Sequence, residues 1–218
     1  ELDREIIAVF TNSNPISNNF QETYEERGLT IPVGTPDSLY RFEGYKLFQL
    51  SGPNVSLADA DDLDKVRLVF QVDIRNGISK IFNWAGLDPD AGDTPTEDIL
   101  YVPELQVDGG DQGIRHTFPI TEDQFAEGNR RLINHRKYYF VAVAYGYNNY
   151  QEFDPQTALG QEAPYIESTR NIGDGENSFY TVIPRPIIDR ELNAAYGQGP
   201  LITRVDGAGN GGQFLDMT

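Results

Sequence analysis

The sequence has no cysteine, one methionine, one tryptophan and two histidines among its 218 residues. Without cysteine the chain has no disulfide framework, no thiolate zinc site and no cysteine nucleophile. His116 and His135 are its only imidazole groups. No apolar run approaches the roughly 20 residues that a membrane-spanning helix needs. We therefore expect neither a disulfide-stapled protein nor one that inserts into a membrane.

Positive charge is also scarce, because 17 Lys and Arg residues stand against 34 Asp and Glu residues, which gives a formal charge of −17. A chain this acidic is repelled by nucleic-acid phosphates and by anionic membrane surfaces, which argues against both as partners. Its first residues lack the basic region and apolar stretch of a signal peptide. This start fits either a cytosolic protein or a piece of a longer one. The lack of disulfides also leaves the compartment open, because many exported bacterial proteins share it.

The apolar residues come in short runs, separated by many of the 21 Gly and 13 Pro residues, which favours turns over long helices. Polar, largely acidic stretches over 11–39, 51–64 and 85–98 are interpreted as long loops. Many short strands with almost no helix predict an all-β protein, an antiparallel β-sandwich with long acidic loop insertions. The predicted strands cover residues 6–10, 40–50, 70–74, 78–84, 99–107, 114–120, 137–147, 165–168 and 179–183.

Two local patterns make sharper predictions. The pair Asn76-Gly77 lies between two strand-like runs and predicts a type I′ hairpin, whose two turn residues both need positive φ. Thr121 and Gln124 have the spacing of a capping box, which predicts a helix of about two turns at most over 122–127.

The C-terminal part of the chain has a different composition from the rest. Pro184 and Pro186 remove backbone donors, and few apolar anchors follow before residue 201. We therefore expect one sandwich over 1–184, followed over 185–218 by a linker and the opening hairpin of a further module.

Two segments, LINHRKYYFVAVA (132–144) and FEGYKLF (42–48), resemble the fibronectin type III family. In that family a Leu stands six residues before a Tyr, and apolar residues follow at alternate positions up to an Ala. The resemblance implies a sandwich in which Tyr138 is the tyrosine-corner residue, with its hydroxyl bonded to nearby backbone. The residues that match this pattern are Leu132, Tyr138, Phe140, Ala142 and Ala144.

Together with YIEST, TVIPRP and GNGG further along, these segments look like the module of very large exported proteins of Bacteroidota, often carried by the type IX secretion route. The resemblance implies an extracellular or cell-surface location. It also implies a non-catalytic structural or adhesive role, in which the module spaces its loops and contacts neighbouring modules or other surface proteins.

Clustered aspartates suggest calcium, because hard cations take six to eight oxygen ligands from carboxylates and carbonyls. The alternative is a solvated acidic loop, and the sequence leaves both open. Calcium is the only cofactor that the sequence suggests. The candidate ligands are Asp88, Asp90 and Asp93 in one loop, Asp59, Asp61, Asp62 and Asp64 in another, and Asp108 with Asp111 as a weaker third set.

Aromatic and amide side chains gather where the strand 137–147 ends, which suggests a second function, binding of polysaccharide. Aromatic rings pack on sugar faces and amides bond sugar hydroxyls, although loop-end aromatics also serve as core residues. The candidate ligand-binding residues are Tyr145, Tyr147, Tyr150, Phe153 and Asn149.

The sequence does not predict an enzyme. Neither histidine stands beside a nucleophile motif such as GxSxG. The glycine run over 207–212 follows a strand but precedes no helix, so it does not predict a dinucleotide site.

Overall fold

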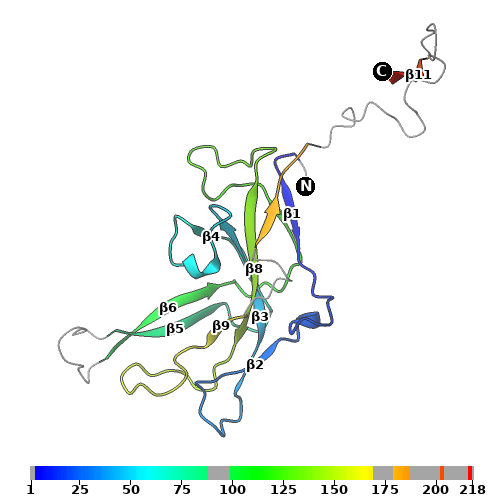
Figure 1. Cartoon of the computed structure of the whole chain (residues 1–218). Coiled ribbons are helices and arrows are strands. Elements are labelled where there is room, and N and C mark those ends of the chain that lie inside the picture. Colours follow the sequence, from blue (N-terminus) through cyan, green and yellow to red (C-terminus); the bar gives the residue numbers. More distant parts are fainter. Residues whose placement is uncertain (1–2, 88–98, 169–178, 187–201, 204–215, 218) are drawn as a thin grey trace. The chain divides into compact units, whose positions relative to one another are not determined.

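The computed structural model describes residues 3–87, 99–168, 179–186, 202–203 and 216–217. The chain divides into two units, Glu1–Arg185 and Pro186–Thr218. Within the described residues the regular structure is antiparallel β-strand (Figure 1), apart from two single helical turns, η1 (Phe20–Glu22) and η2 (Leu57–Asp59). This confirms the all-β, antiparallel sandwich class that the sequence predicts.

The larger sheet of the first unit comprises β2 (Glu25–Arg27), β3 (Leu39–Leu50), β4 (Val66–Asp73), β8 (Tyr138–Tyr147), β9 (Tyr165–Glu167) and β10 (Tyr180–Val182). The two long strands, β3 and β8, pair side by side in its centre. The outer edge of β3 pairs first with β2 and then with β4. The outer edge of β8 pairs with β10 at its start and with β9 at its end.

A smaller sheet, β1 (Ile6–Val9) paired with β7 (Thr117–Ile120), packs over one face of the larger one. Its inward side chains Ile6 and Ile120 meet Leu47 of β3 and Phe140 of β8, and all four are at least 96% buried. Alternate residues of each strand therefore point into a shared core, as in other β-sandwiches.

The opposite face of β3 and β8 is also covered, which the two-sided apolar pattern of 137–147 predicts. Leu50, Val66 and Val141 form a second buried cluster there. Val55 and Leu57 pack against it from the segment around η2. Part of the polar insertion over 51–64 is thus a cover for the core.

A separate hairpin is formed by β5 (Lys80–Leu87) and β6 (Leu100–Asp108). Its base is anchored by Ile81 and Val107, which pack against Tyr145 and Tyr165 of the larger sheet. From that base the hairpin runs away from β3 and β8 (Figure 1). Pro103 lies in β6 opposite Trp84, in a sheet of two strands, where a proline is tolerated at an edge.

Tyr138 confirms the most specific structural prediction made from the sequence. Its side chain is 98% buried, and its hydroxyl oxygen accepts a hydrogen bond of 2.9 Å from the backbone N–H of Ile133. The hydroxyl therefore holds the preceding turn, in which His135 has φ +65°, against the start of β8.

The predicted hairpin at Asn76-Gly77 is wrong. β4 pairs with β3 and β5 pairs with β6, so this segment connects two different sheets. Gly77 has φ +90° but Asn76 is not in the left-handed region, whereas a type I′ turn requires both. The turn is instead held by a residue distant in the sequence. The backbone N–H groups of Asn76 and Gly77 both donate to Asp111 Oδ1, at 2.8 and 3.0 Å.

The predicted helix over 122–127 is also wrong, because these residues form turns. Asp123 is drawn into the interior, where Oδ1 accepts hydrogen bonds from Gln49 Nε2 at 2.7 Å and from the Phe125 N–H at 3.0 Å. Arg136 Nη1 lies 3.3 Å from the other carboxylate oxygen. A capping box does form at the start of η2, between Ser56 and Asp59.

In the second unit, β11 (Ile202–Thr203) pairs antiparallel with β12 (Asp216–Met217). The boundary between the units, after Arg185, lies beside the predicted one. That this segment opens a further module stays a prediction.

Candidate functional site

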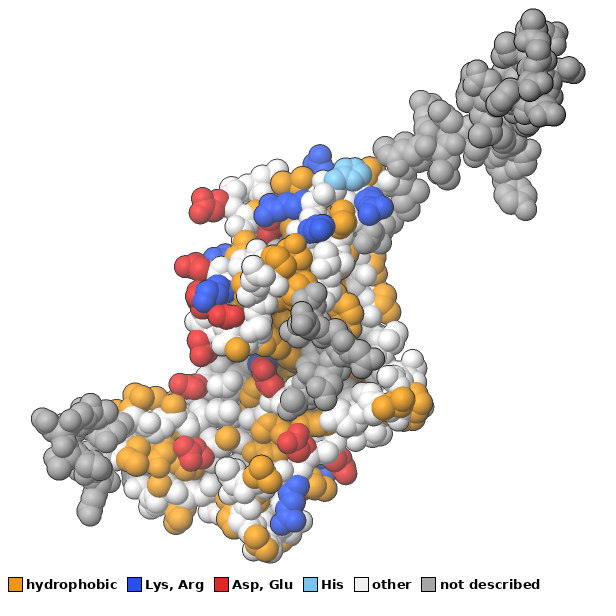
Figure 2. Space-filling model, viewed as in Figure 1, with side chains coloured by type: hydrophobic (Ala, Val, Ile, Leu, Met, Phe, Trp, Pro, Cys, Tyr) orange, Lys and Arg blue, Asp and Glu red, His pale blue; other side chains and the backbone are white. Residues whose placement is uncertain are grey.

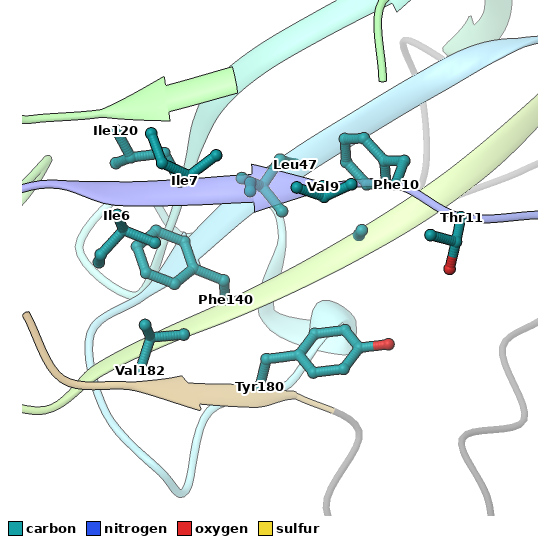
Figure 3. Close-up of a pocket in the computed structure, with 12 residues that line it drawn as sticks. Ile6, Ile7, Val9, Phe10, Thr11, Leu47, Ile120, Phe140, Tyr180 and Val182 are labelled. Atoms are coloured by element: carbon teal, nitrogen blue, oxygen red, sulfur yellow. The ribbon is translucent and has the colours of Figure 1, made fainter. Parts of the chain in front are cut away.

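An apolar groove of about 290 Å³ lies between β1 and β10, at the edge of the sandwich. Ile6, Phe140 and Val182 point toward one another across it (Figure 3). Leu47 and Ile120 complete its floor. These floor residues belong to the main core, so the groove is a place where the core approaches solvent.

The β1 edge of this groove presents backbone groups that face away from β7. Within the described residues β1 pairs only with β7. The Phe10 N–H donates to His116 O at 2.8 Å, and bonding alternates along an antiparallel pair, so Ile6 and Ala8 also bond to β7. The N–H and C=O groups of Ile7 and Val9 therefore face away from β7. Their side chains are 36% and 60% exposed.

Two further cavities, each of about 340 Å³, meet at Trp84 on the β5–β6 hairpin. We call them together the Trp84 groove. The first is lined by Tyr147, Asn149 and Phe153 from the end of β8 and the loop after it. The second is lined by Tyr150 and by residues 160–163. Trp84 and Gln161 line both.

Hydrogen bonds fix the hairpin against the larger sheet at this groove. The Trp84 N–H donates to Glu162 O at 2.8 Å. Asn83 makes a reciprocal pair with the backbone of Tyr165, donating through Nδ2 at 3.2 Å and accepting at Oδ1 at 2.9 Å. The ring of Phe153 packs between the hairpin aromatics, 5.4 Å from Trp84 and 5.0 Å from Tyr101.

The loop that forms the other wall is equally well bonded. Gln161 is 96% buried, and its Oε1 accepts from the Tyr150 N–H at 2.9 Å. The Tyr150 hydroxyl donates to Gly160 O at 3.2 Å. Asn148 Nδ2 donates to Leu39 O at 2.9 Å, which ties the loop to β3. The groove is therefore preorganised.

The structure brings four of the five candidate ligand-binding residues to this groove, namely Tyr147, Asn149, Tyr150 and Phe153, of which Phe153 is 93% buried. The fifth, Tyr145, is a correction. Its side chain is fully buried, and its hydroxyl donates to Val72 O at 3.1 Å, so it is a core residue. Sequence reasoning missed Trp84, although it is the chain's only tryptophan and lies in a predicted strand.

The second set of candidate calcium ligands lies near basic groups. Asp59 Oδ1 and Asp62 Oδ2 lie 3.1 and 3.2 Å from Lys65 Nζ. The Ser56 backbone N–H and the Lys65 ammonium hold the pKa of Asp59 below its ordinary value. Asp64 Oδ1 lies 3.8 Å from Arg67 Nη2.

In the third set, Asp108 pairs with Lys80 at 3.3 Å, and Asp111 accepts the backbone bonds of the 76–77 turn. Asp88, Asp90 and Asp93 lie outside the described residues. The described part of the chain contains no group of three or more His, Cys, Asp or Glu side chains placed to hold a metal ion. Calcium stays a prediction.

A buried lysine, Lys46, lies in β3 of the larger sheet. Lys46 is 94% buried, its Nζ donates to the Tyr165 hydroxyl at 2.7 Å, and it lies 4.2 Å from the Tyr165 ring centroid. Burial lowers the pKa of Lys46, and the charge of Glu167, 3.7 Å away, partly opposes this. The Tyr165 hydroxyl donates to Glu167 Oε1 at 2.6 Å, so the three groups form one chain of hydrogen bonds.

Comparisons with protein-family models, with curated proteins and with solved structures returned no match for this chain. Among the described residues, no helix has the length and apolar character needed to cross a membrane.

Proposed function

We propose that this chain is a non-catalytic structural or adhesive module of a secreted or cell-surface protein, and that it contacts another protein by accepting an extended strand on β1. The observation that carries the proposal is the open edge of β1 beside an apolar groove. An extended peptide added there would bond the outward backbone groups of Ile7 and Val9, and its side chains would enter the groove.

The order of the strands supports a fibronectin type III-like module. The sheet β4-β3-β8-β10 faces the smaller pair β1-β7, and the buried Tyr138 occupies the tyrosine-corner position. The formal charge of −17 keeps such a module soluble.

The two histidines support a non-catalytic role. His116 Nε2 lies 2.7 Å from Glu22 Oε1, close to the Tyr45 hydroxyl. His135 occupies the tight turn that Tyr138 holds. The His116 imidazole is thus paired with a carboxylate, and the His135 side chain is exposed.

The test uses a displayed library of eight-residue peptides selected on the whole chain. We expect enriched peptides with alternating apolar residues. Adding such a peptide should slow hydrogen exchange at the amides of Ile7 and Val9. The amides of Ile6, Ala8 and Phe10 should change little, because they already bond to β7.

A matched pair of variants locates the contact. Val9→Lys places a charge on the edge strand, which opposes strand addition, and should weaken peptide binding at least tenfold. Val33→Lys changes a valine that is 92% exposed and lies outside the groove, and should leave binding unchanged. Failure to enrich any peptide, or equal binding by the two variants, would contradict the proposal.

A further inference from the structure

We infer that the Trp84 groove binds a neutral oligosaccharide, which goes beyond the protein-contact function proposed above. The groove has the two elements that such a ligand needs. Aromatic rings can lie against the apolar faces of sugar rings, and polar groups without internal partners can bond sugar hydroxyls.

The aromatic element comes from both walls. Trp84 and the 40% exposed Phe82 belong to the hairpin, and Tyr147 belongs to the end of β8. Phe153, from the loop after β8, is 93% buried and packs against the Trp84 ring. Trp84 lines both cavities, so the two cavities of about 340 Å³ adjoin at this residue. This arrangement suits a chain of linked sugar rings that passes over the indole, rather than one small molecule.

The polar element consists of side chains that the fold leaves unused. Among the described residues no group accepts a hydrogen bond from the Trp84 indole N–H, and none pairs with the Asn149 amide or the Tyr147 hydroxyl. By contrast, Gln161 beside them accepts from the Tyr150 backbone N–H and donates to Ala163 O. An unused donor next to a well-bonded framework is available to a ligand without disturbing the fold.

The charged groups that line the groove favour neutral sugars over anionic ones. Three carboxylates line the groove, those of Glu104, Glu152 and Glu162. Its one ammonium group, that of Lys80, is already paired with Asp108 at 3.3 Å. Phosphate, sulfate and uronate groups would be repelled, whereas neutral hydroxyls can donate to carboxylates. Figure 2 shows hydrophobic side chains gathered toward the far end of the hairpin.

Because Trp84 is the only tryptophan, its fluorescence reports on this groove alone. The first experiment screens the whole chain on an array of neutral β-glucan, xylan, mannan, galactan and chitin oligosaccharides, with uronate-containing and sulfated glycans beside them. Soluble oligosaccharides that bind are then titrated while Trp84 emission is recorded. We expect a neutral oligosaccharide to bind and to shift the emission to the blue.

Variants separate this site from the β1 edge. Asn149→Ala removes an exposed side chain that has no hydrogen-bond partner among the described residues, and it should weaken sugar binding about tenfold, the loss of one or two hydrogen bonds. Trp84→Phe keeps an apolar ring but removes the N–H and should also weaken binding. Val9→Lys should leave sugar binding unchanged, and Asn149→Ala should leave capture of strand peptides unchanged.

The inference is overturned if no neutral glycan binds, if only anionic glycans bind, or if binding leaves Trp84 emission and the Asn149→Ala affinity unaltered. A proline-rich peptide that shifts Trp84 emission where no glycan does would also overturn it, because aromatic grooves take polyproline helices as well. None of these results decides the outcome of the strand-peptide experiment on β1.

Discussion

Glu43 provides the sharpest prediction about stability. It is the extra residue of a β-bulge in β3, where the pairing with β8 shifts register between Phe42 and Gly44. The bulge directs its side chain inward, where it is 98% buried. Asn76 Nδ2 lies 3.0 and 2.9 Å from its two carboxylate oxygens. Burial raises the pKa of Glu43 to about 7, the charges of Asp73 and Asp111 act in the same direction, and the Asn76 bond opposes them.

The sign of the pH effect follows from proton binding. In the unfolded chain Glu43 loses its proton near its ordinary pKa of 4.5, whereas in the folded chain it keeps the proton until about pH 7. Between these values the folded state binds more protons, so the free energy of unfolding falls as the pH rises. A pKa difference of about 2.5 units corresponds to about 3 kcal/mol, lost between pH 4.5 and pH 7 and constant above.

The perturbation is Glu43→Gln, which resembles the protonated acid and cannot ionise. We expect the variant to unfold with nearly the wild-type free energy near pH 4.5. Near pH 8 it should be more stable than wild type by up to about 3 kcal/mol. Urea unfolding followed by circular dichroism measures the difference at each pH, and other titrating groups cancel in it.

The control is Glu127→Gln, at an exposed position. It should give a difference from wild type that does not depend on pH. If the Glu43→Gln difference is also independent of pH, or if it grows as the pH falls, the reasoning from burial is refuted.

Two other predictions concern the hydroxyl of Tyr138 and calcium. Tyr138→Phe leaves the Ile133 N–H without its acceptor and should lower the free energy of unfolding by about 1–2 kcal/mol. Tyr139→Phe, whose ring packs on Phe179 instead, should change it little, and equal losses would show that the Tyr138 bond adds nothing. If the acidic loops bind calcium, melting in millimolar calcium against chelator should show stabilisation of about 2.7 kcal/mol at 100 times the dissociation constant, and an unchanged melting temperature would leave those loops as solvated acid.

The sequence predicts strands well where the pattern is set by burial. The segments 40–50 and 137–147 are long, aromatic and apolar on both sides, and they form the central pair of the larger sheet. The same logic locates β1, since Ile6 and Ala8 alternate with more exposed residues. These patterns record which face of each strand meets the core, and burial of that face is the dominant driving force.

Pairing partners are harder to predict, because they depend on contacts between distant segments. Asn76-Gly77 is a strong local turn signal, yet Asn76 is held by Glu43 and Asp111, more than thirty residues away in each direction. The predicted helix over 122–127 fails for the same reason, since Asp123 bonds Gln49 across the core. A local propensity of about 1 kcal/mol is outweighed by such buried bonds.

The Trp84 groove shows the same limit for function. The sequence points to the aromatic and amide residues after β8 because they are neighbours along the chain. It gives no sign that Trp84 joins them, because that requires the β5–β6 hairpin to dock beside β9. It also does not reveal that Tyr145 turns inward while Tyr147, two residues on, reaches the groove.

A substitution at Gly44 would test how tightly the β3 bulge and the core around Tyr145 are packed. A methyl group at Gly44 would overlap the carbonyl oxygen of Val72 and lie 2.5 Å from the Tyr145 hydroxyl. Those two atoms are hydrogen-bonded to each other, so Gly44→Ala must displace β4 or break that bond. Overpacking and one lost bond should together cost about 2–4 kcal/mol in urea unfolding. Gly52→Ala meets no atom within 4 Å and should change stability by less than about 1 kcal/mol. If the two variants unfold at the same urea concentration, Tyr145 is not packed against Gly44, and its assignment to the core rather than to the ligand groove is wrong.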